Sequence, residues 1–206
     1  IPLRLVGSEM CIRDSYNNEQ KTVKWIKSNY KVEFVMIDKL TEGAACTVLH
    51  AHRLINNDTP LLIANSDQIV DMDISEYIND SKKRGLDGSV LCFEDNDKKW
   101  SYAKLDKNRF ITEIREKEVI SKNATVGIYY FNKGRDFVEN AIDMIVRNER
   151  VNNEFYVAPV YNYAINQGKK FGIYTIGKTQ MHGTGTPEDL DKYIETVKEQ
   201  QGALVL

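Results

Sequence analysis

A run of four apolar residues, Leu61-Leu62-Ile63-Ala64, ends abruptly in the polar stretch Asn65-Ser66-Asp67-Gln68. A cluster of turn residues precedes the run at positions 56–60. A continuous apolar run bounded by turn signals is typical of a central strand that is buried on both faces. Further strands are expected at 33–37, 88–93 and 171–176, with helices between them. This alternation predicts an α/β domain built on a mixed, mostly parallel central sheet.

Amphipathic patterns indicate the positions of the helices. Apolar residues at a spacing of 3.6 predict helices at 19–29, 44–55, 73–84, 135–146 and 153–166. A last helix begins after Thr186, whose side chain can cap it, with Pro187 in the first turn. Strand-like segments at 100–105, 110–114 and 125–131 lie close together along the chain, so hairpins are expected there.

Charge and cysteine content limit the kinds of partner. The chain has 206 residues, of which 28 are basic and 30 acidic, for a net charge of −2. This balance argues against a nucleic-acid partner and against binding to a membrane surface. No apolar run approaches the roughly 20 residues needed to cross a bilayer. The three scattered cysteines fit a reducing compartment, so a cytoplasmic protein is expected.

The first fifteen residues differ from the rest of the chain. Their sequence, IPLRLVGSEMCIRDS, has no period that continues past Tyr16. It resembles a translated cloning or sequencing adapter, and a native irregular arm is the alternative. We therefore expect a non-native segment at 1–15 and a domain at 16–206.

The end of the apolar run is the first candidate site, because open α/β sheets bind ligands beyond the carboxyl ends of their strands. Asp67 stands at that place and could be a ligand for Mg²⁺, which prefers carboxylate oxygen, or could cap a turn. Asp71 and Asp73 could join it or belong to the solvated start of a helix.

Two glycines also stand out. Gly43 precedes a helix, where the backbone can approach a flat or anionic ligand or simply form a turn. Gly127 lies inside a predicted strand, a position that often marks a bulge or a closely approaching ligand. Lys117 lies in a charged turn, and His182 precedes the Gly/Thr-rich loop 183–187.

Several stretches in the same order resemble the sugar-phosphate nucleotidyltransferase family, the nucleoside-diphosphate-sugar pyrophosphorylases. The resemblance extends from about Lys31 to Val197. It rests on the stretches Thr41-Glu42-Gly43-Ala44-Ala45, Ile63-Ala64-Asn65-Ser66-Asp67, Glu116-Lys117, Thr125-Val126-Gly127-Ile128-Tyr129 and Gly183-Thr184-Gly185-Thr186-Pro187-Glu188-Asp189-Leu190. It implies a Rossmann-like nucleotide-diphospho-sugar transferase fold.

The reaction implied by the resemblance moves a nucleotidyl group from a nucleoside triphosphate to a sugar 1-phosphate and releases pyrophosphate. Positioning and charge neutralisation are then the main catalytic requirements. By the family's motifs, Asp67 would hold Mg²⁺ against the α-phosphate. Thr41, Gly43 and Ala44 would bind the nucleotide, with the last two lining the base through their backbone.

The same resemblance implies an acceptor site. Lys117 would offset the charge of the acceptor phosphate, and Glu116 would bind acceptor hydroxyls. Val126 and Gly127 would let the acceptor lie against the strand, and Glu154 would face it. A phosphorylated sugar of surface-polysaccharide synthesis is the expected acceptor, a phosphocholine-like one is an alternative, and an oligomer is possible.

Two departures from the family pattern affect these expectations. The family begins with a strand and a Gly-rich basic loop, and nothing before Tyr16 resembles them. We therefore expect a fragment that lacks its first βα unit and is inactive as written. The family also has a second metal-binding aspartate where this chain has Gly183. Water and substrate oxygens could complete the metal's ligands, His182 could substitute, or this subgroup could handle metal differently.

Two other functions remain open at this stage. A glycosyltransferase of the same fold would use Asp71-Met72-Asp73 as its metal–diphosphate motif. A non-catalytic nucleotide-binding domain would agree with glycine at position 183.

Overall fold

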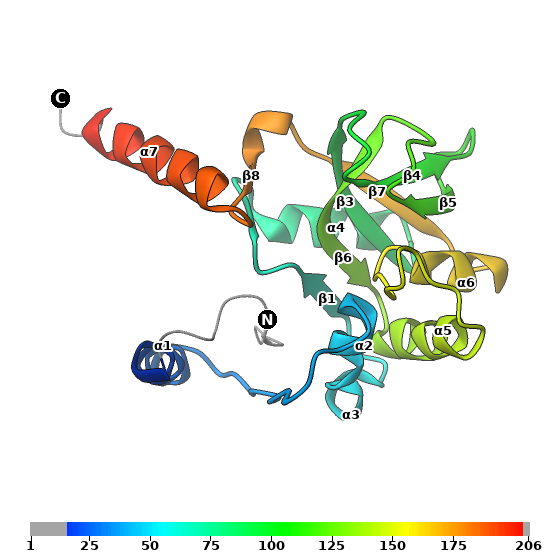
Figure 1. The fold of residues 1–206 in the computed structure, drawn as a ribbon. Helices are drawn as coiled ribbons and strands as arrows, with labels where there is room; N and C mark the ends of the chain where they lie inside the picture. Colours follow the sequence, from blue (N-terminus) through cyan, green and yellow to red (C-terminus); the bar gives the residue numbers. More distant parts are fainter. Residues whose placement is uncertain (1–15, 204–206) are drawn as a thin grey trace.

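The computed structural model of the chain describes residues 16–203. The predicted adapter-like segment 1–15 lies outside the described residues. The described part consists of a twisted central sheet with helices packed on both faces, as Figure 1 shows. An α/β fold is therefore confirmed.

Six strands form the central sheet. The strand order across the sheet is β5–β4–β6–β3–β7, and β1 pairs in addition with β6. The strand bounds are β1 (Leu61–Ala64), β3 (Gly88–Glu94), β4 (Ser101–Leu105), β5 (Ile111–Glu116), β6 (Asn123–Phe131) and β7 (Phe171–Thr175). The long strand β6 thus connects the β4–β5 hairpin to β1.

The sheet is mixed, as predicted, but the expectation that it is mostly parallel is wrong. Among the strands of residues 16–203, only β3 and β7 pair in parallel, whereas β6 is antiparallel to β1, β3 and β4. The strands β1, β3, β4 and β7 all run in one direction. Because β6 lies between β1 and β3, their common direction does not produce parallel pairing.

The expectation that residues 61–64 form a central strand, buried on both faces, is also wrong. Among the described strands, β1 pairs with β6 alone, in a register that places Leu61 opposite Phe131. Ile63 is the one buried residue of this strand. An apolar run predicts a strand, but it carries no information on which strands lie beside it.

Two hydrophobic cores cover the two faces of the sheet. Val90, Cys92 and Phe131 face the core formed with α5 (Gly134–Val146) and α6 (Val160–Asn166). Neighbouring strand residues, such as Leu91, Phe93 and Tyr130, face the core on the side of α4 (Ile74–Lys83). Because successive side chains of a strand alternate between faces, both sets come from the same strands. The apolar character of β3 and β6 follows from burial on both sides.

The predicted helices are confirmed in part. Asp73 caps α4 by accepting a hydrogen bond of 2.8 Å from the backbone N–H of Ser75. The single helix predicted at 44–55 is two short helices, α2 (Ala44–Leu49) and α3 (His52–Ile55). The helix predicted from residue 153 begins at Val160, because residues 151–154 form a bridged turn. The strand predicted at 33–37 is absent, apart from one bridge residue, Val35.

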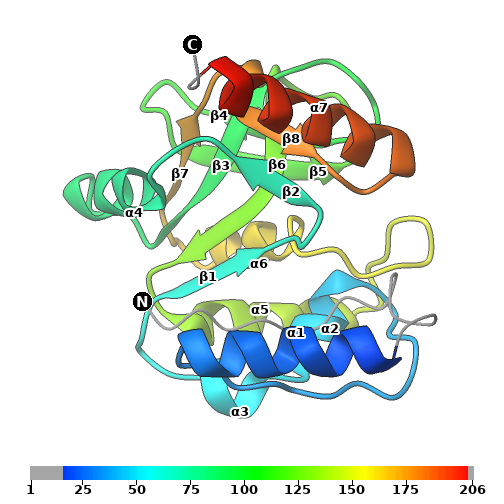
Figure 2. The same cartoon turned by 90° about the vertical axis from the view of Figure 1, so that its left-hand side faces the viewer.

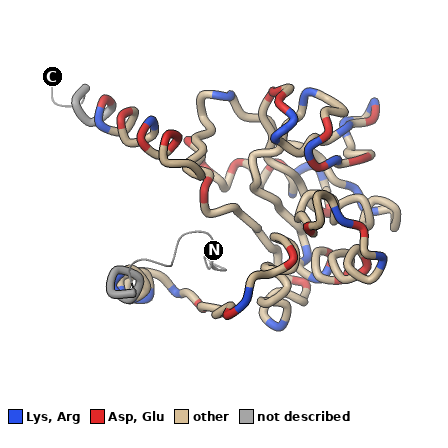
Figure 3. The backbone as a smooth tube through the Cα atoms, in the orientation of Figure 1, with Lys and Arg blue, Asp and Glu red and all other residues tan. Residues whose placement is uncertain are grey.

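The two terminal helices stand apart from the sheet. In Figures 1 and 2, α1 (Tyr16–Asn29) and α7 (Pro187–Ala203) project from the same side of the molecule. Thr186 caps α7 as predicted, since its Oγ1 accepts a hydrogen bond from the backbone N–H of Asp189 at 3.2 Å. Acidic and basic residues are mixed along α7, with the acidic ones in excess (Figure 3). Within the described part of the chain, the helices are too short or too polar to span a bilayer.

A small ribbon connects α7 to the rest of the fold. It consists of β2 (Gln68–Val70) and β8 (Met181–Gly183), paired antiparallel and preceded by the short helix η1 (Lys178–Gln180). Sequence patterns did not predict either strand, because three residues are too few to show a period. The ribbon brings the loop that follows β8 next to the loop that follows β1.

Candidate functional site

A cavity of about 210 Å³, which we call the β6 cavity, lies where β6, the end of β5 and three loops meet. Four residues predicted to bind ligands line it, namely Ala44, Glu116, Val126 and Gly127. The remaining predicted site residues, Lys117, Glu154, Thr41, Gly43 and Asp67, are not part of its lining.

Gly127 is the residue that opens this cavity. Its φ of 92° is in the left-handed region that favours glycine. A Cβ atom at this position would overlap the side-chain amides of Asn65 and Gln68, which also line the cavity. The backbone N–H of Asn65 donates to the carbonyl of Gly127 at 3.0 Å. A strand glycine therefore lets the polar loop after β1 close over β6.

Glu116 ends β5 with its side chain largely shielded from water. The Ser101 hydroxyl donates a hydrogen bond to its carboxylate. Burial raises the pKa of Glu116 above its ordinary value, although the Ser101 bond and the charge of Lys117 both act to lower it. A partly desolvated carboxylate of this kind is a strong acceptor for ligand hydroxyl groups.

Lys117 follows directly, in a left-handed backbone conformation with φ of 56°. Its Nζ donates to the hydroxyl of Tyr156 at 2.9 Å and lies 5.0 Å from the centre of that ring. The Tyr156 hydrogen bond is the main reason why the pKa of Lys117 is raised. Tyr156 itself lines the β6 cavity, so its contact holds the ammonium group of Lys117 at the rim.

Glu154, Gly43 and Thr41 lie near this rim. The exposed Glu154 adds to the raised pKa of both Glu116 and Tyr156 through its charge. Gly43 has φ of 123°, and a Cβ there would overlap the backbone of Phe155. Thr41 Oγ1 donates to the carbonyl of Gly43 at 3.2 Å. Gly43 thus lets the start of α2 lie close to the 151–157 loop, Thr41 supports the turn at Gly43, and the nucleotide contacts of both residues stay a prediction.

Asp67 lies beside the β6 cavity, against the Gly/Thr loop. Its backbone carbonyl accepts a hydrogen bond from Thr184 N–H at 2.8 Å. A Cβ atom on Gly185 would lie 2.8 Å from Asp67 Oδ2, so glycine leaves room for the carboxylate. Asp67 is half-buried, and its neighbours Asn65 and Gln68 point to the cavity instead.

The other acidic residues after β1 are already engaged. His182 Nε2 donates to Asp71 Oδ2 at 2.7 Å, and the His182 ring packs against Tyr193 of α7. The carboxylate of Asp73 caps α4. These contacts engage one carboxylate oxygen of Asp71, one of Asp73 and one ring nitrogen of His182.

The protein groups suited to a divalent cation are therefore few. Within residues 16–203, no three His, Cys, Asp or Glu side chains come together as a metal cage. The carboxylate of Asp67 makes no hydrogen bond in the described part of the chain, which leaves its oxygens available. One carboxylate fits the mode in which Mg²⁺ takes most of its ligands from phosphates and water.

Sequence reasoning missed several residues of the β6 cavity. Gln68, Trp100 and Tyr156 line it, and none was predicted as a site residue. Within the described residues, Gln68 Oε1 and Trp100 Nε1 are buried without a hydrogen-bond partner. Buried polar atoms are normally hydrogen-bonded, so an unpaired acceptor and an unpaired donor in residues that line one cavity are candidates for contacts with a polar ligand. Gln68 adjoins the predicted Asp67, which was the one available signal.

Comparison with known proteins identifies the family. The sequence profile described as "Nucleotidyl transferase" matches residues 9–200.

The chain belongs to the nucleotidyl transferase family.

Solved structures of similar fold agree with the family. A nucleoside-diphosphate-sugar pyrophosphorylase from Vibrio cholerae has a TM-score of 0.73 and 22% identity, covering 89% of this chain and 78% of that protein. A UDP-glucose pyrophosphorylase complexed with UDP-glucose has a TM-score of 0.67 and 15% identity, covering 90% of this chain and 74% of the other. Among curated protein sequences, none matches significantly. The predicted nucleotide-sugar transferase fold is confirmed.

Proposed function

We propose that this nucleotidyltransferase joins a nucleoside monophosphate to a sugar 1-phosphate or a related phosphorylated acceptor. The observation that carries the proposal is the grouping of Glu116, the Lys117–Tyr156 pair and two unpaired polar atoms around one cavity over Gly127. In the reaction, an acceptor phosphate oxygen attacks the α-phosphorus of the triphosphate. The bond from the α-phosphorus to the bridging oxygen breaks, and pyrophosphate leaves with the electron pair.

The β6 cavity is the proposed acceptor site. Glu116 accepts hydrogen bonds from acceptor hydroxyls, and the acceptor lies against Val126 and Gly127, where no side chain projects from the glycine. Lys117 provides positive charge for the acceptor phosphate, and Tyr156 keeps its ammonium group in place. Glu154 contacts the acceptor from the exposed side of the rim. These groups lower the barrier by preorganised charge and position, with no covalent enzyme intermediate.

The proposed nucleotide site adjoins this cavity. Gly43 and Ala44 line the base, and Thr41 supports the turn that presents them. Asp67 is the proposed Mg²⁺ ligand, in the single-carboxylate mode that its surroundings allow. When bound, Mg²⁺ neutralises charge on the phosphates of the nucleotide. The Gly/Thr loop holds Asp67 toward the space in which those phosphates would lie.

We place this reaction in the cytoplasm, in the synthesis of surface-polysaccharide precursors, and expect an oligomer to be possible. It stays a prediction that residues 16–206 form a domain without its first βα unit, and that a chain of this sequence is therefore inactive. The engaged carboxylates of Asp71 and Asp73 make the glycosyltransferase alternative the weaker one.

Two measurements test the proposed function. Calorimetry on this chain measures the binding of sugar 1-phosphates, and we expect Glu116→Ala to weaken it at least tenfold. Pyrophosphate release is then measured with a panel of triphosphates and acceptors, using the protein as its gene encodes it. Transfer from a nucleotide sugar without pyrophosphate formation would favour a glycosyltransferase, and nucleotide binding without turnover would favour a non-catalytic domain.

A further inference from the structure

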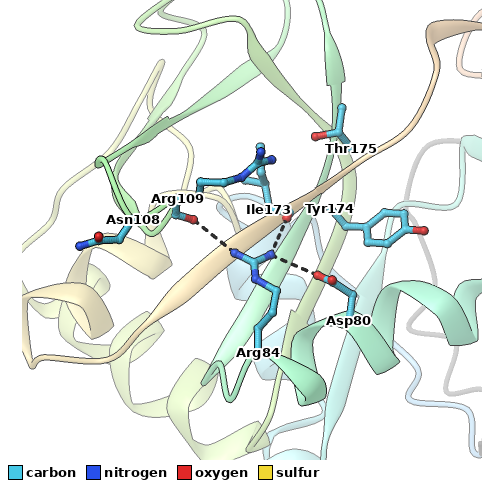
Figure 4. A pocket seen from close by; sticks show the side chains of 7 residues that line it. All are labelled: Asp80, Arg84, Asn108, Arg109, Ile173, Tyr174 and Thr175. Atoms are coloured by element: carbon cyan, nitrogen blue, oxygen red, sulfur yellow. Dashed lines mark hydrogen bonds and ion pairs between the residues drawn. The ribbon is translucent and has the colours of Figure 1, made fainter.

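A second cavity, of about 380 Å³, lies at the outer edge of β7 and is shown in Figure 4. It shares no lining residue with the β6 cavity. Three elements form its walls: the end of α4, the turn between β4 and β5, and residues 173–175 of β7. We call it the β7 cavity. Its volume is in the range of about 300–1,000 Å³ that is common for small-molecule sites.

Arg84 is fixed at the base of the β7 cavity. Its Nη1 atom donates to Asp80 Oδ2 at 3.1 Å and to the Ile173 carbonyl at 3.0 Å, while Nη2 donates to the Arg109 carbonyl at 3.3 Å (Figure 4). A Cβ on Gly172 would lie 2.6 Å from Nη2, so a glycine in β7 makes room for the guanidinium. Arg84 thus connects β7 to the β4–β5 turn, the two ends of the path through the sheet.

Arg109 faces the same space with its charge uncompensated. Its side chain extends from the turn toward β7 (Figure 4). Within residues 16–203, its guanidinium group makes no hydrogen bond or ion pair. Asp106, an acid in the same turn, instead accepts the backbone N–H groups of Asn108 at 2.8 Å and Phe110 at 2.9 Å through its Oδ1.

The charges of the lining residues favour an anionic ligand. Two guanidinium groups face one carboxylate, and Asp80 is already paired with Arg84. The three hydrogen bonds of Arg84 leave two of its five N–H donors unused. Arginine matches phosphate geometry because its planar donors can bond two oxygens at once. Asn108 and Thr175 add neutral polar groups at the rim.

We propose that the β7 cavity is a second ligand site, which binds a phosphate-bearing small molecule through Arg109 and Arg84. The site is separate from the proposed reaction, because none of its residues belongs to the β6 cavity. The shared chemistry is the phosphate group, which an inorganic anion or a nucleotide can supply.

The test is calorimetry on the full chain at low salt, in EDTA, with three probes: inorganic phosphate, pyrophosphate and ATP. The key variant is Arg109→Gly, because Arg109 has φ of 64° and glycine adopts this conformation without strain. We expect Arg109→Gly to weaken the binding of at least one probe tenfold or more, with an unchanged melting temperature. Equal affinity for pyrophosphate and ATP would identify the anion as the ligand, whereas tighter ATP binding would show that the nucleoside contributes.

Two control variants make the result specific. Arg53→Gln removes one exposed positive charge on α3, and Lys117→Gln removes the cation beside the β6 cavity. We expect Arg53→Gln to bind the responsive probe as the unchanged chain does, and any binding that Lys117→Gln removes, at the proposed acceptor site, to be separate from the binding that Arg109→Gly removes. Loss of binding in Lys117→Gln with full binding in Arg109→Gly would place the anion at the β6 cavity and overturn the proposal. Failure of all three probes to bind at millimolar concentration would also overturn it.

Discussion

Glu116 and Gly127 stand on strands of the central sheet, whereas Asp67 lies in a loop held by the short ribbon of β2 and β8. Eight of the nine residues of β6 are buried, but no residue of β2 or β8 is. Segments with little buried apolar surface open at a lower free-energy cost than buried strands. The proposed acceptor site around Glu116 and Gly127 is therefore preformed, and we call it the preformed side. The proposed phosphate site around Asp67 can adapt when a ligand binds, and we call it the adaptable side.

The largest expected effect comes from the adaptable side. Asp67→Asn keeps the size and polarity of the side chain but removes the charge proposed to hold Mg²⁺. We expect turnover to fall about 10³-fold, since metal-ion catalysis supplies several kcal/mol. Pyrophosphate release, measured in the protein as its gene encodes it, checks this value. Unchanged turnover would remove Asp67 from the site, and Asp73→Asn, at the cap of α4, is the matched control.

On the preformed side, Lys117→Gln is expected to lower kcat/KM about 10²-fold, the scale of losing one preorganised charge contact. Tyr156→Phe leaves the lysine in place but removes its hydrogen-bond partner, so a smaller loss is expected. Steady-state kinetics with a varied acceptor concentration measures both changes. A larger loss in Tyr156→Phe than in Lys117→Gln would show that Tyr156 does more than position Lys117.

Glycine substitutions compare the rigidity of the two sides directly. Gly127→Ala places a Cβ among the side chains of Asn65 and Gln68 at a strained backbone angle, so we expect a loss of about 2 kcal/mol in unfolding free energy. Gly183→Ala, on β8, meets no atom within 4 Å and should change stability by less than about 0.5 kcal/mol. Urea denaturation measures both. Equal losses would contradict the difference between the two sides.

The smallest expected effect is the pH dependence that Glu116 contributes. Burial raises its pKa above the ordinary 4.5, so the folded protein holds this proton more tightly than the unfolded chain does. Its contribution to stability is then fully present below pH 4.5 and is lost as the pH rises through the folded-state pKa. Glu116→Gln should remove this loss. The melting temperature of the variant, relative to that of the unchanged chain, should therefore increase as the pH rises from 4 to 8. A gain independent of pH would contradict this assignment.

The β6 side contains more of the residues named from the sequence than the Asp67 side does. Glu116, Val126 and Gly127 line one cavity, and they were named from contiguous motifs that resemble the family's; their binding roles stay predictions. Gln68 and Trp100 were missed, because their approach to the cavity depends on how distant loops close over β6. The β2–β8 ribbon was missed because pairing of Gln68 with Gly183 leaves no local pattern. Mostly parallel pairing was predicted wrongly, because strand order is a long-range property.

The position of β6 has a consequence for the order in which the chain folds. Its first residues pair with β4, which is close in sequence, but its last residues pair with β1, where Phe131 lies opposite Leu61. Closing that long loop has an entropic cost, which earlier local contacts reduce. The hairpin region should therefore form first and the attachment of β1 later. Since Asn65 and Asp67 follow β1, the proposed reaction centre would be completed only in the last stage of folding.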